Sequence, residues 1–180
     1  MFLGRLNFKK GLDVLISAFA DAAKDADDLR LVLAGPGDGM ESRARAWVRK
    51  YGIENKTVLT GMLTGPEIQE AYRDAEMFAL PSYSENFGIA VVEAMAMGVP
   101  VLISDRVNIW REVAGAGAGL VSAPDVDGFA ELIHQAAAPD FDLAGMGARA
   151  LARTRFDWSE IGGSLEALYR SVSEMLSKAA

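Results

Sequence analysis

Short apolar runs alternate with segments of helical periodicity along most of the chain. Residues 29–34 are almost continuously apolar and lead into the turn Gly35-Pro36-Gly37, which is typical of a buried strand. Residues 11–23 carry apolar side chains at the spacing of one helix face. The same criteria predict strands at 1–4, 29–34, 57–60, 77–80, 100–103 and 119–122. They predict helices at 11–23, 41–51, 66–73, 87–97, 109–114, 125–137, 143–153 and 159–177.

This alternation predicts an α/β fold with a parallel sheet that helices cover on both faces. Right-handed crossovers then give one doubly wound, Rossmann-like sheet of about six strands, in a single domain spanning residues 1–180. Aromatic residues in the helical segments are expected in the core: Trp47, Phe129, Trp158 and Tyr169. Ligands of such folds bind at the carboxyl ends of the strands. The loops at 4–11, 35–39, 61–65, 81–88 and 104–108 are therefore the candidate site.

Composition narrows the classes of partner. The chain has 18 Lys and Arg against 25 Asp and Glu, a net charge of −7, which argues against a nucleic-acid partner. A few local cations can still bind a small anion. The absence of cysteine excludes disulfides, thiolate metal sites and cysteine nucleophiles, and it fits a cytoplasmic protein. No apolar run has the length of a transmembrane segment.

The first loop is basic. Arg5, Lys9 and Lys10 lie between Gly4 and Gly11, where a strand ends and a helix begins. Guanidinium and ammonium groups both bind phosphate oxygens, so this loop is either a pyrophosphate site or a solvated basic turn.

The fourth loop leads into the helix expected at 87–97. Asn86, Phe87 and Gly88 should present free amides at its N-terminus, an arrangement that suits a phosphate. Glu85 precedes the helix and Glu93 lies in its second turn. Because the neighbours of Glu93 are apolar, its carboxylate needs a partner, and a vicinal diol such as that of ribose can supply two donors. The alternative is that Glu93 pairs with a core arginine and Glu85 is merely exposed.

These motifs together resemble the retaining GT-B glycosyltransferases known as group 1 or family 4. Two glutamates separated by seven residues are the hallmark of that family, and they occur here in S-E-N-F-G-I-A-V-V-E-A-M-A-M-G-V-P-V, residues 84–101. The family's G-R-L-x-x-x-K-G loop matches residues 4–11, its G-x-G turn matches 35–37, and a strand-ending glycine matches Gly61. The resemblance covers essentially the whole chain and implies the donor-binding, C-terminal half of a GT-B fold.

The resemblance implies roles for individual residues. Arg5 and Lys10 would grip the donor diphosphate and Glu85 would contact the transferred sugar, and we group these three as the catalytic residues. Glu93 would hold the ribose diol, and backbone groups near Met62 and Leu63 would meet the base. The full set of implied donor-binding residues is Gly4, Gly35, Gly37, Met62, Leu63, Asn86, Phe87, Gly88 and Glu93.

The donor implied is a nucleoside-diphosphate sugar of UDP or GDP type, with no cofactor and no metal. Three Asp-x-Asp matches, at 25–27, 125–127 and 140–142, are interpreted as a charge run, a helix cap and a turn. The single histidine, His134, lies in a late helix and is expected on its surface.

The chain departs from the family in two ways. Residues 104–112 keep Glu112 but lack the glycine pair that often precedes it. Asn108 and Trp110 stand in this stretch and either reshape the donor pocket or face another domain. An N-terminal acceptor domain is also absent, so the chain is expected to be an inactive fragment, whose parent protein is either cytoplasmic or peripheral at a membrane. Two alternative functions remain: a non-catalytic α/β interaction module, and a GT-B epimerase or phosphorylase.

Overall fold

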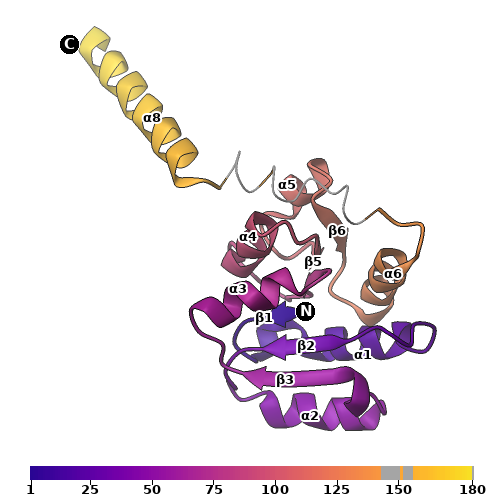
Figure 1. Ribbon diagram of the computed structural model, residues 1–180. Helices are drawn as coiled ribbons and strands as arrows, with labels where there is room; N and C mark the ends of the chain where they lie inside the picture. The colour runs from indigo at the N-terminus through magenta and orange to yellow at the C-terminus, as the bar shows by residue number, and fades with distance from the viewer. Residues whose placement is uncertain (143–150, 152–155, 180) are drawn as a thin grey trace.

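The strands form two parallel three-stranded sheets that meet edge to edge (Figure 1). The computed structural model describes residues 1–142, 151 and 156–179. One sheet has the order β1 (Phe2–Leu3), β2 (Leu31–Ala34), β3 (Thr57–Gly61), and the other has the order β4 (Phe78–Leu80), β5 (Val101–Ser104), β6 (Gly119–Ser122). The amide of Ala79 donates to the Met1 carbonyl at 2.8 Å, so β4 lies beside β1. The strands therefore run in the spatial order 3-2-1-4-5-6.

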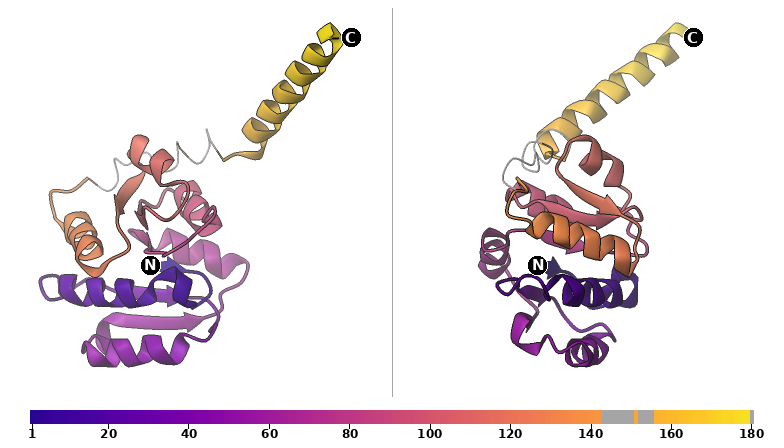
Figure 2. Two further views of the ribbon diagram at one scale, coloured as in Figure 1. Left: turned by 180° about the vertical axis from the view of Figure 1, so that it is seen from behind. Right: turned by 90° about the vertical axis from the view of Figure 1, so that its right-hand side faces the viewer.

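Helices connect the strands and cover both faces of the sheets (Figure 2). The α-helices are α1 (Leu12–Ala22), α2 (Glu41–Lys50), α3 (Pro66–Arg73), α4 (Ile89–Ala96), α5 (Trp110–Gly115), α6 (Val126–Ala137) and α8 (Trp158–Ala179). Short 3-10 helices lie at η1 (Phe8–Lys10) and η2 (Glu54–Lys56). The predicted doubly wound α/β fold is confirmed, although the one sheet expected is divided into two. The helix predicted at 143–153 lies outside the described residues except at Leu151.

Local sequence signals explain where several helices begin. Asp125 precedes α6, and its carboxylate accepts the Gly128 amide at 2.8 Å as an N-cap. Pro66 opens α3, where its missing N–H costs no hydrogen bond. The helix predicted to begin at residue 87 begins instead at Ile89, because Gly88 adopts a left-handed conformation (φ 77°) and serves as its N-cap. This shift decides which amides the helix leaves free.

The core lies between the sheets and the helices packed on them. Phe2, Phe78 and Phe129 are fully buried, which confirms the prediction for Phe129, and Trp47 is half-buried against the core. The prediction for Tyr169 is wrong, because its side chain is 68% exposed on α8, a helix that extends away from the α/β body (Figures 1 and 2). The side chain of Trp158 lies outside the described residues.

Candidate functional site

The strand order reverses between β1 and β4, and the loops that follow these two strands are packed together. The amide of Tyr83 donates to the Lys9 carbonyl at 2.8 Å, and the Tyr83 ring stacks on Phe8 with 5.3 Å between centroids. In open α/β folds, the crevice at such a reversal is where ligands bind. The two loops that carry the strongest sequence motifs therefore border the position where this topology places a ligand.

Lys10 and Glu85 come from these two loops and form an ion pair. The Lys10 ammonium donates to Glu85 Oε2, and the two side chains are only 23% and 18% exposed. The backbone of Glu85 is held on both sides, since its amide donates to the Arg106 carbonyl at 3.0 Å and its carbonyl accepts the Asn108 amide at 3.1 Å. The interpretation of Glu85 as merely exposed is therefore wrong.

Arg5, the other predicted cation, points to a different partner. Its guanidinium lies 3.4 Å from Asp38 Oδ2, which also accepts a hydrogen bond from Asn7 Nδ2 at 2.9 Å. The Arg5 side chain is 72% exposed, and an exposed ion pair of this kind is worth about 0–1 kcal/mol. Little free energy therefore holds Arg5 against Asp38.

A run of free amides lies next to the ion pair. Among the described residues, the backbone amides from Asn86 to Ala90 donate to no acceptor. They mark the N-terminus of α4, where the helix dipole adds partial positive charge. Ile89 and Ala90 belong to this run but were not predicted, because the sequence pattern placed the helix start two residues too early. The run is a ready binding site for an anion.

Glu93 lies on α4 in a different environment from the one predicted. Its side chain is exposed, because the helix turns Val91, Ala94 and Met95 toward the core instead. Its partner is not an arginine: the hydroxyl of Tyr72, on α3, lies 3.1 Å from Glu93 Oε2. Burial, with the negative charge of Glu93 and this hydrogen bond, raises the pKa of Tyr72 well above its usual range. Tyr72 is therefore a donor to Glu93 at every physiological pH.

The predicted glycines bring the loops after β1, β2 and β3 into contact. Gly35 has φ 136°, and a Cβ built on it would lie 1.9 Å from the Gly4 carbonyl oxygen, so only glycine permits this approach. The Gly35 amide donates to the Gly61 carbonyl at 2.7 Å. Gly37 pairs with Leu6 in an isolated parallel bridge.

Met62 and Leu63, which the resemblance assigns to the base, follow β3 directly. The Met62 side chain is 68% exposed and Leu63 is half-buried.

Tyr83 also holds an acidic residue that sequence reasoning missed. Its hydroxyl donates to Asp13 Oδ2 at 2.9 Å, while Asp13 Oδ1 is buried with no hydrogen-bond partner in the described part of the chain. Burial first, then the hydrogen bond to Asp13 and its charge, raise the pKa of Tyr83 to about 12. The only sequence signal for Asp13 is its position in the first turn of a helix, where carboxylates are common. No pattern in the sequence points to Tyr72.

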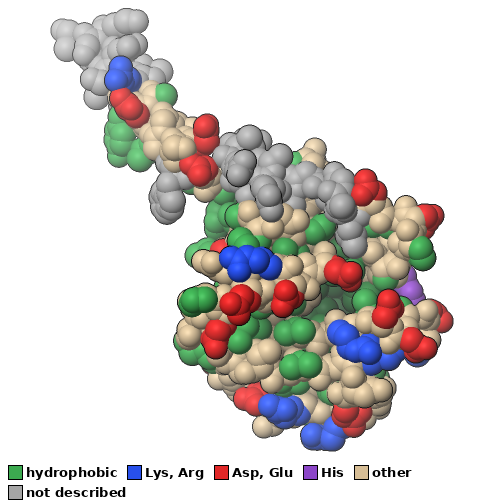
Figure 3. All heavy atoms as spheres, in the orientation of Figure 1, with side chains coloured by type: hydrophobic (Ala, Val, Ile, Leu, Met, Phe, Trp, Pro, Cys, Tyr) green, Lys and Arg blue, Asp and Glu red, His purple; other side chains and the backbone are tan. Residues whose placement is uncertain are grey.

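The remaining sequence expectations concern metals, nucleic acids and membranes. Within residues 1–142, 151 and 156–179, no group of three or more His, Asp or Glu side chains could hold a metal ion. His134 lies on α6, 39% exposed and 3.6 Å from Asp21, as expected of a helix-surface residue. Acidic and basic side chains are interspersed over the described surface seen in Figure 3, and they form no continuous basic area on that face. Among the described helices, none combines the length and apolarity needed to cross a bilayer.

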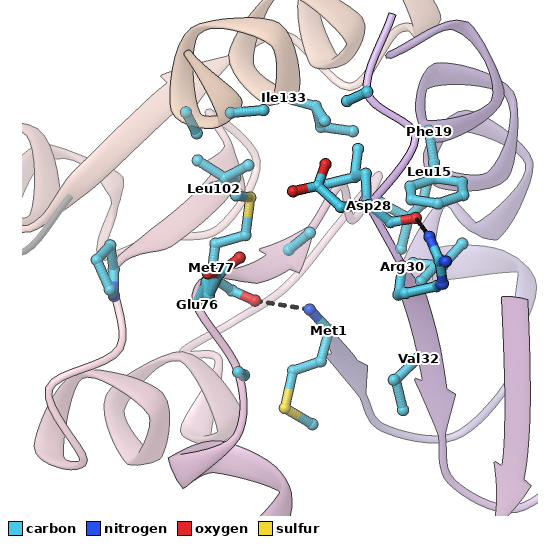
Figure 4. Close-up of a pocket in the computed structure, with 18 of the residues that line it drawn as sticks. Met1, Leu15, Phe19, Asp28, Arg30, Val32, Glu76, Met77, Leu102 and Ile133 are labelled. Carbon is cyan, nitrogen blue, oxygen red and sulfur yellow. Dashed lines mark hydrogen bonds between the residues drawn. The ribbon is translucent and has the colours of Figure 1, made fainter. Parts of the chain in front are cut away.

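A cavity of about 920 Å³ lies away from these loops, near the amino-terminal ends of the strands (Figure 4). Its lining combines apolar residues such as Phe19, Leu102 and Ile133 with the side chains of Asp28 and Glu76. The Met1 amino group donates to the Met77 carbonyl at 2.6 Å there. No residue predicted for the site lines this cavity.

Comparisons with known proteins agree with the geometry. The family described as glycosyl transferases group 1 matches residues 1–143. The phosphatidyl-myo-inositol mannosyltransferase of Mycolicibacterium smegmatis is 33% identical over 177 residues, which cover 96% of this chain and 45% of the mannosyltransferase. The sucrose-phosphate synthase structure from Thermosynechococcus elongatus superposes with a TM-score of 0.79 at 26% identity, covering 97% of this chain and 45% of the synthase.

A third comparison shows the same fold. The Anabaena protein HepE, in complex with UDP and glucose, has a TM-score of 0.77 at 22% identity, with 98% of this chain and 47% of HepE covered. The chain thus spans less than half the length of each of these proteins. The match of the family to most of the chain, on the fold and motifs described above, shows that this chain belongs to the group 1 glycosyltransferases.

Proposed function

We propose that the chain binds the nucleoside-diphosphate-sugar donor of a retaining, metal-independent glycosyltransferase. The observation that carries this proposal is the Lys10–Glu85 ion pair, set beside the free amides of residues 86–90 where the strand order reverses. A cation for phosphate and a carboxylate for sugar hydroxyls lie in contact there. A donor has its phosphate and its sugar joined by a single oxygen, so it needs both groups side by side.

Lys10 and Arg5 would stabilise the negative charge of the leaving diphosphate. In transfer, the bond between the sugar's anomeric carbon and the diphosphate oxygen would break, an acceptor hydroxyl oxygen would bond to the same face of the sugar, and its proton would pass to the leaving diphosphate. The transition state has oxocarbenium character, so negative charge grows on the diphosphate as it leaves. A cation about 4 Å from that charge contributes roughly 4 kcal/mol at an effective dielectric constant near 20. Lys10, Arg5 and the α4 N-terminus would supply this stabilisation without a metal.

The other end of the donor would extend toward α4 and β3. Glu93 carries an exposed carboxylate that can accept hydrogen bonds from both hydroxyls of a ribose. The backbone around Met62 and Leu63 would meet the base. The UDP in the HepE complex supports a UDP-type nucleotide here, and a GDP-type nucleotide remains the other candidate of the same chemistry.

Turnover would require a second domain that binds the acceptor. The chain covers only about half of its relatives, and its one histidine lies on α6, away from the predicted site loops. We therefore assign donor binding to this chain and catalysis to the chain joined to its N-terminal partner domain.

Isothermal titration of the 180-residue chain with UDP, GDP and ADP tests the proposal, each with and without a chelator. We expect at least one nucleotide to bind with the same affinity in both conditions. A folded sample that binds none of the three overturns the donor site, and binding that the chelator abolishes overturns the metal-independent mechanism.

Two substitutions test the roles proposed for the two glutamates. Glu93→Ala should weaken binding of the nucleotide itself, whereas Glu85→Ala should weaken binding of the nucleotide sugar more than that of the nucleotide, because only the sugar would contact Glu85. Removing one partner of a charge-assisted hydrogen bond costs about 1.5–3 kcal/mol, which is a tenfold or larger loss of affinity. An unchanged nucleotide affinity in Glu93→Ala refutes its assignment to ribose.

A further inference from the structure

Tyr72 connects the core to the exposed face of α4. Its ring is buried, with 2% exposure, and packs on Phe78 of β4 with 6.0 Å between ring centroids. Its hydroxyl emerges beside α4, 3.1 Å from Glu93 Oε2 and 3.1 Å from the Ala90 carbonyl oxygen. Among the described residues, it is the only side chain that hydrogen-bonds to Glu93.

The hydroxyl has one proton and two acceptors within reach. The carboxylate is charged and the carbonyl is neutral, and hydrogen bonds to charged acceptors are roughly twice as strong. The proton therefore lies mainly on the line to Glu93. Because burial raises the pKa of the phenol, Tyr72 keeps its proton and acts as a fixed donor.

This contact restrains a side chain that would otherwise be free to move. Glu93 is exposed on a helix, and a glutamate has several rotatable bonds whose freedom must be lost when it binds a ligand. Tyr72 is rigid by comparison, since its ring is locked in the core. With Oε2 held, the remaining lone pairs of the carboxylate stay available to a ligand. Pre-ordering of this kind lowers the cost of binding.

We propose that Tyr72 is a positioning residue that fixes the Glu93 carboxylate for the vicinal diol of the donor's ribose. The inference rests on the proposed function, because it requires that Glu93 binds the diol. It makes Tyr72, which touches no ligand itself, responsible for part of the preference for ribonucleotides.

The test compares each nucleoside diphosphate with its 2′-deoxy counterpart. The wild type and Tyr72→Phe are titrated with UDP and 2′-deoxy-UDP, and with the GDP and ADP pairs if UDP does not bind. Tyr51→Phe is the matched control, because it also removes a tyrosine hydroxyl with a single side-chain partner, Ser17, 3.1 Å away on α1. Circular dichroism confirms that each variant is folded.

We expect Tyr72→Phe to lower the affinity for the ribonucleotide about tenfold, and to lower that for the 2′-deoxynucleotide by less, because only its 3′-hydroxyl remains to bond Glu93. Tyr51→Phe should change neither. An equal loss for both nucleotides would mean that Tyr72 only supports the structure, and no loss would mean that it does not position Glu93; either result overturns this inference alone. If the wild type binds no nucleotide, the proposed function fails and this inference fails with it.

A second measurement does not depend on the folding of Tyr72→Phe. In a sample labelled with ¹³C at the tyrosine Cζ atoms, Glu93→Ala should shift the Tyr72 signal, because the hydroxyl loses its acceptor, and should leave the Tyr51 signal in place. An unmoved Tyr72 signal overturns the proposed contact, whatever the nucleotide affinities show.

Discussion

Replacing Gly11 by alanine should disrupt the site through a single methyl group. Gly11 lies between η1 and α1, directly after Lys10, and has φ 66°. A Cβ at this position would lie 2.1 Å from the Pro81 carbonyl oxygen and 2.9 Å from the Pro81 carbonyl carbon. These are backbone atoms, so no side-chain rotation can relieve the overlap. The loops that carry Lys10 and Glu85 would have to move apart.

The loss of unfolding free energy expected for Gly11→Ala has two parts. A left-handed conformation costs a non-glycine residue roughly 1–2 kcal/mol. Overpacking against atoms that cannot move aside costs about 1–3 kcal/mol more. Gly52 isolates the first part, since it has φ 67° but nothing lies within 4 Å of its would-be Cβ. We therefore expect Gly52→Ala to lower the free energy of unfolding by about 1–2 kcal/mol, and Gly11→Ala by about 2–5 kcal/mol.

Urea denaturation followed by circular dichroism measures the loss of unfolding free energy in each variant. Calorimetry with a nucleoside diphosphate measures the affinity of the site. Gly11→Ala should weaken nucleotide binding as well as stability, whereas Gly52→Ala, at the end of α2, should leave binding intact. Equal destabilisation of the two variants with equal nucleotide affinities would refute the idea that close approach of these two loops builds the site.

Two further predictions concern Tyr83 and Arg5, which lie in the same two loops as the ion pair. Tyr83→Phe removes the one hydrogen bond to the Asp13 carboxylate in the described structure, which should cost about 1–3 kcal/mol in urea denaturation. Because the pKa of Tyr83 is raised from 10 to about 12, the unfolded chain loses this proton first, so stability should fall as the pH rises from 10 to 12 and should fall less in Tyr83→Phe. Arg5→Ala should change stability by less than about 1 kcal/mol, since its pair with Asp38 is exposed, yet it should lower diphosphate affinity severalfold more than monophosphate affinity. An Arg5→Ala variant with unchanged diphosphate affinity would remove Arg5 from the proposed site.

The hydrophobic pattern predicted the elements of this fold well because the buried strands are short apolar runs, whereas the helices carry apolar residues along one face. The bounds of α3 and β6 agree with the prediction, and α1 and α2 differ from it by one residue at each end or fewer. The predicted start of α4 was two residues too early. Apolar periodicity continues through Phe87, but the backbone of Gly88 is left-handed and the helix begins only at Ile89. Periodicity reports which side chains face the core and does not report φ.

Sequence patterns did not predict the contacts between segments that are distant along the chain. The Lys10–Glu85 pair joins residues that are 75 positions apart, and only the adjacency of β1 and β4 makes them neighbours. The same holds for Tyr72 and Glu93, which are neighbours because the Tyr72 hydroxyl on α3 reaches α4. The apolar residues around Glu93 in sequence predicted a carboxylate in need of a partner among apolar neighbours, but a helix gives neighbours in sequence different faces, and Glu93 is exposed. The sequence thus drew attention to the paired glutamates but did not reveal that Lys10 and Tyr72 lie against them.

The Lys10–Glu85 ion pair bears on whether the site should prefer a nucleotide sugar or the free nucleotide. Glu85 accepts a hydrogen bond from Lys10, so a diphosphate bound as proposed would share this lysine with a carboxylate. A nucleoside diphosphate without a sugar would bring a terminal phosphate, with its higher negative charge, against Glu85. A nucleotide sugar would instead present hydroxyl donors to Glu85 while its diphosphate meets Lys10. In the proposed complex, Glu85 would therefore favour the intact donor over the nucleotide that remains after transfer, an asymmetry that would help the spent nucleotide to leave.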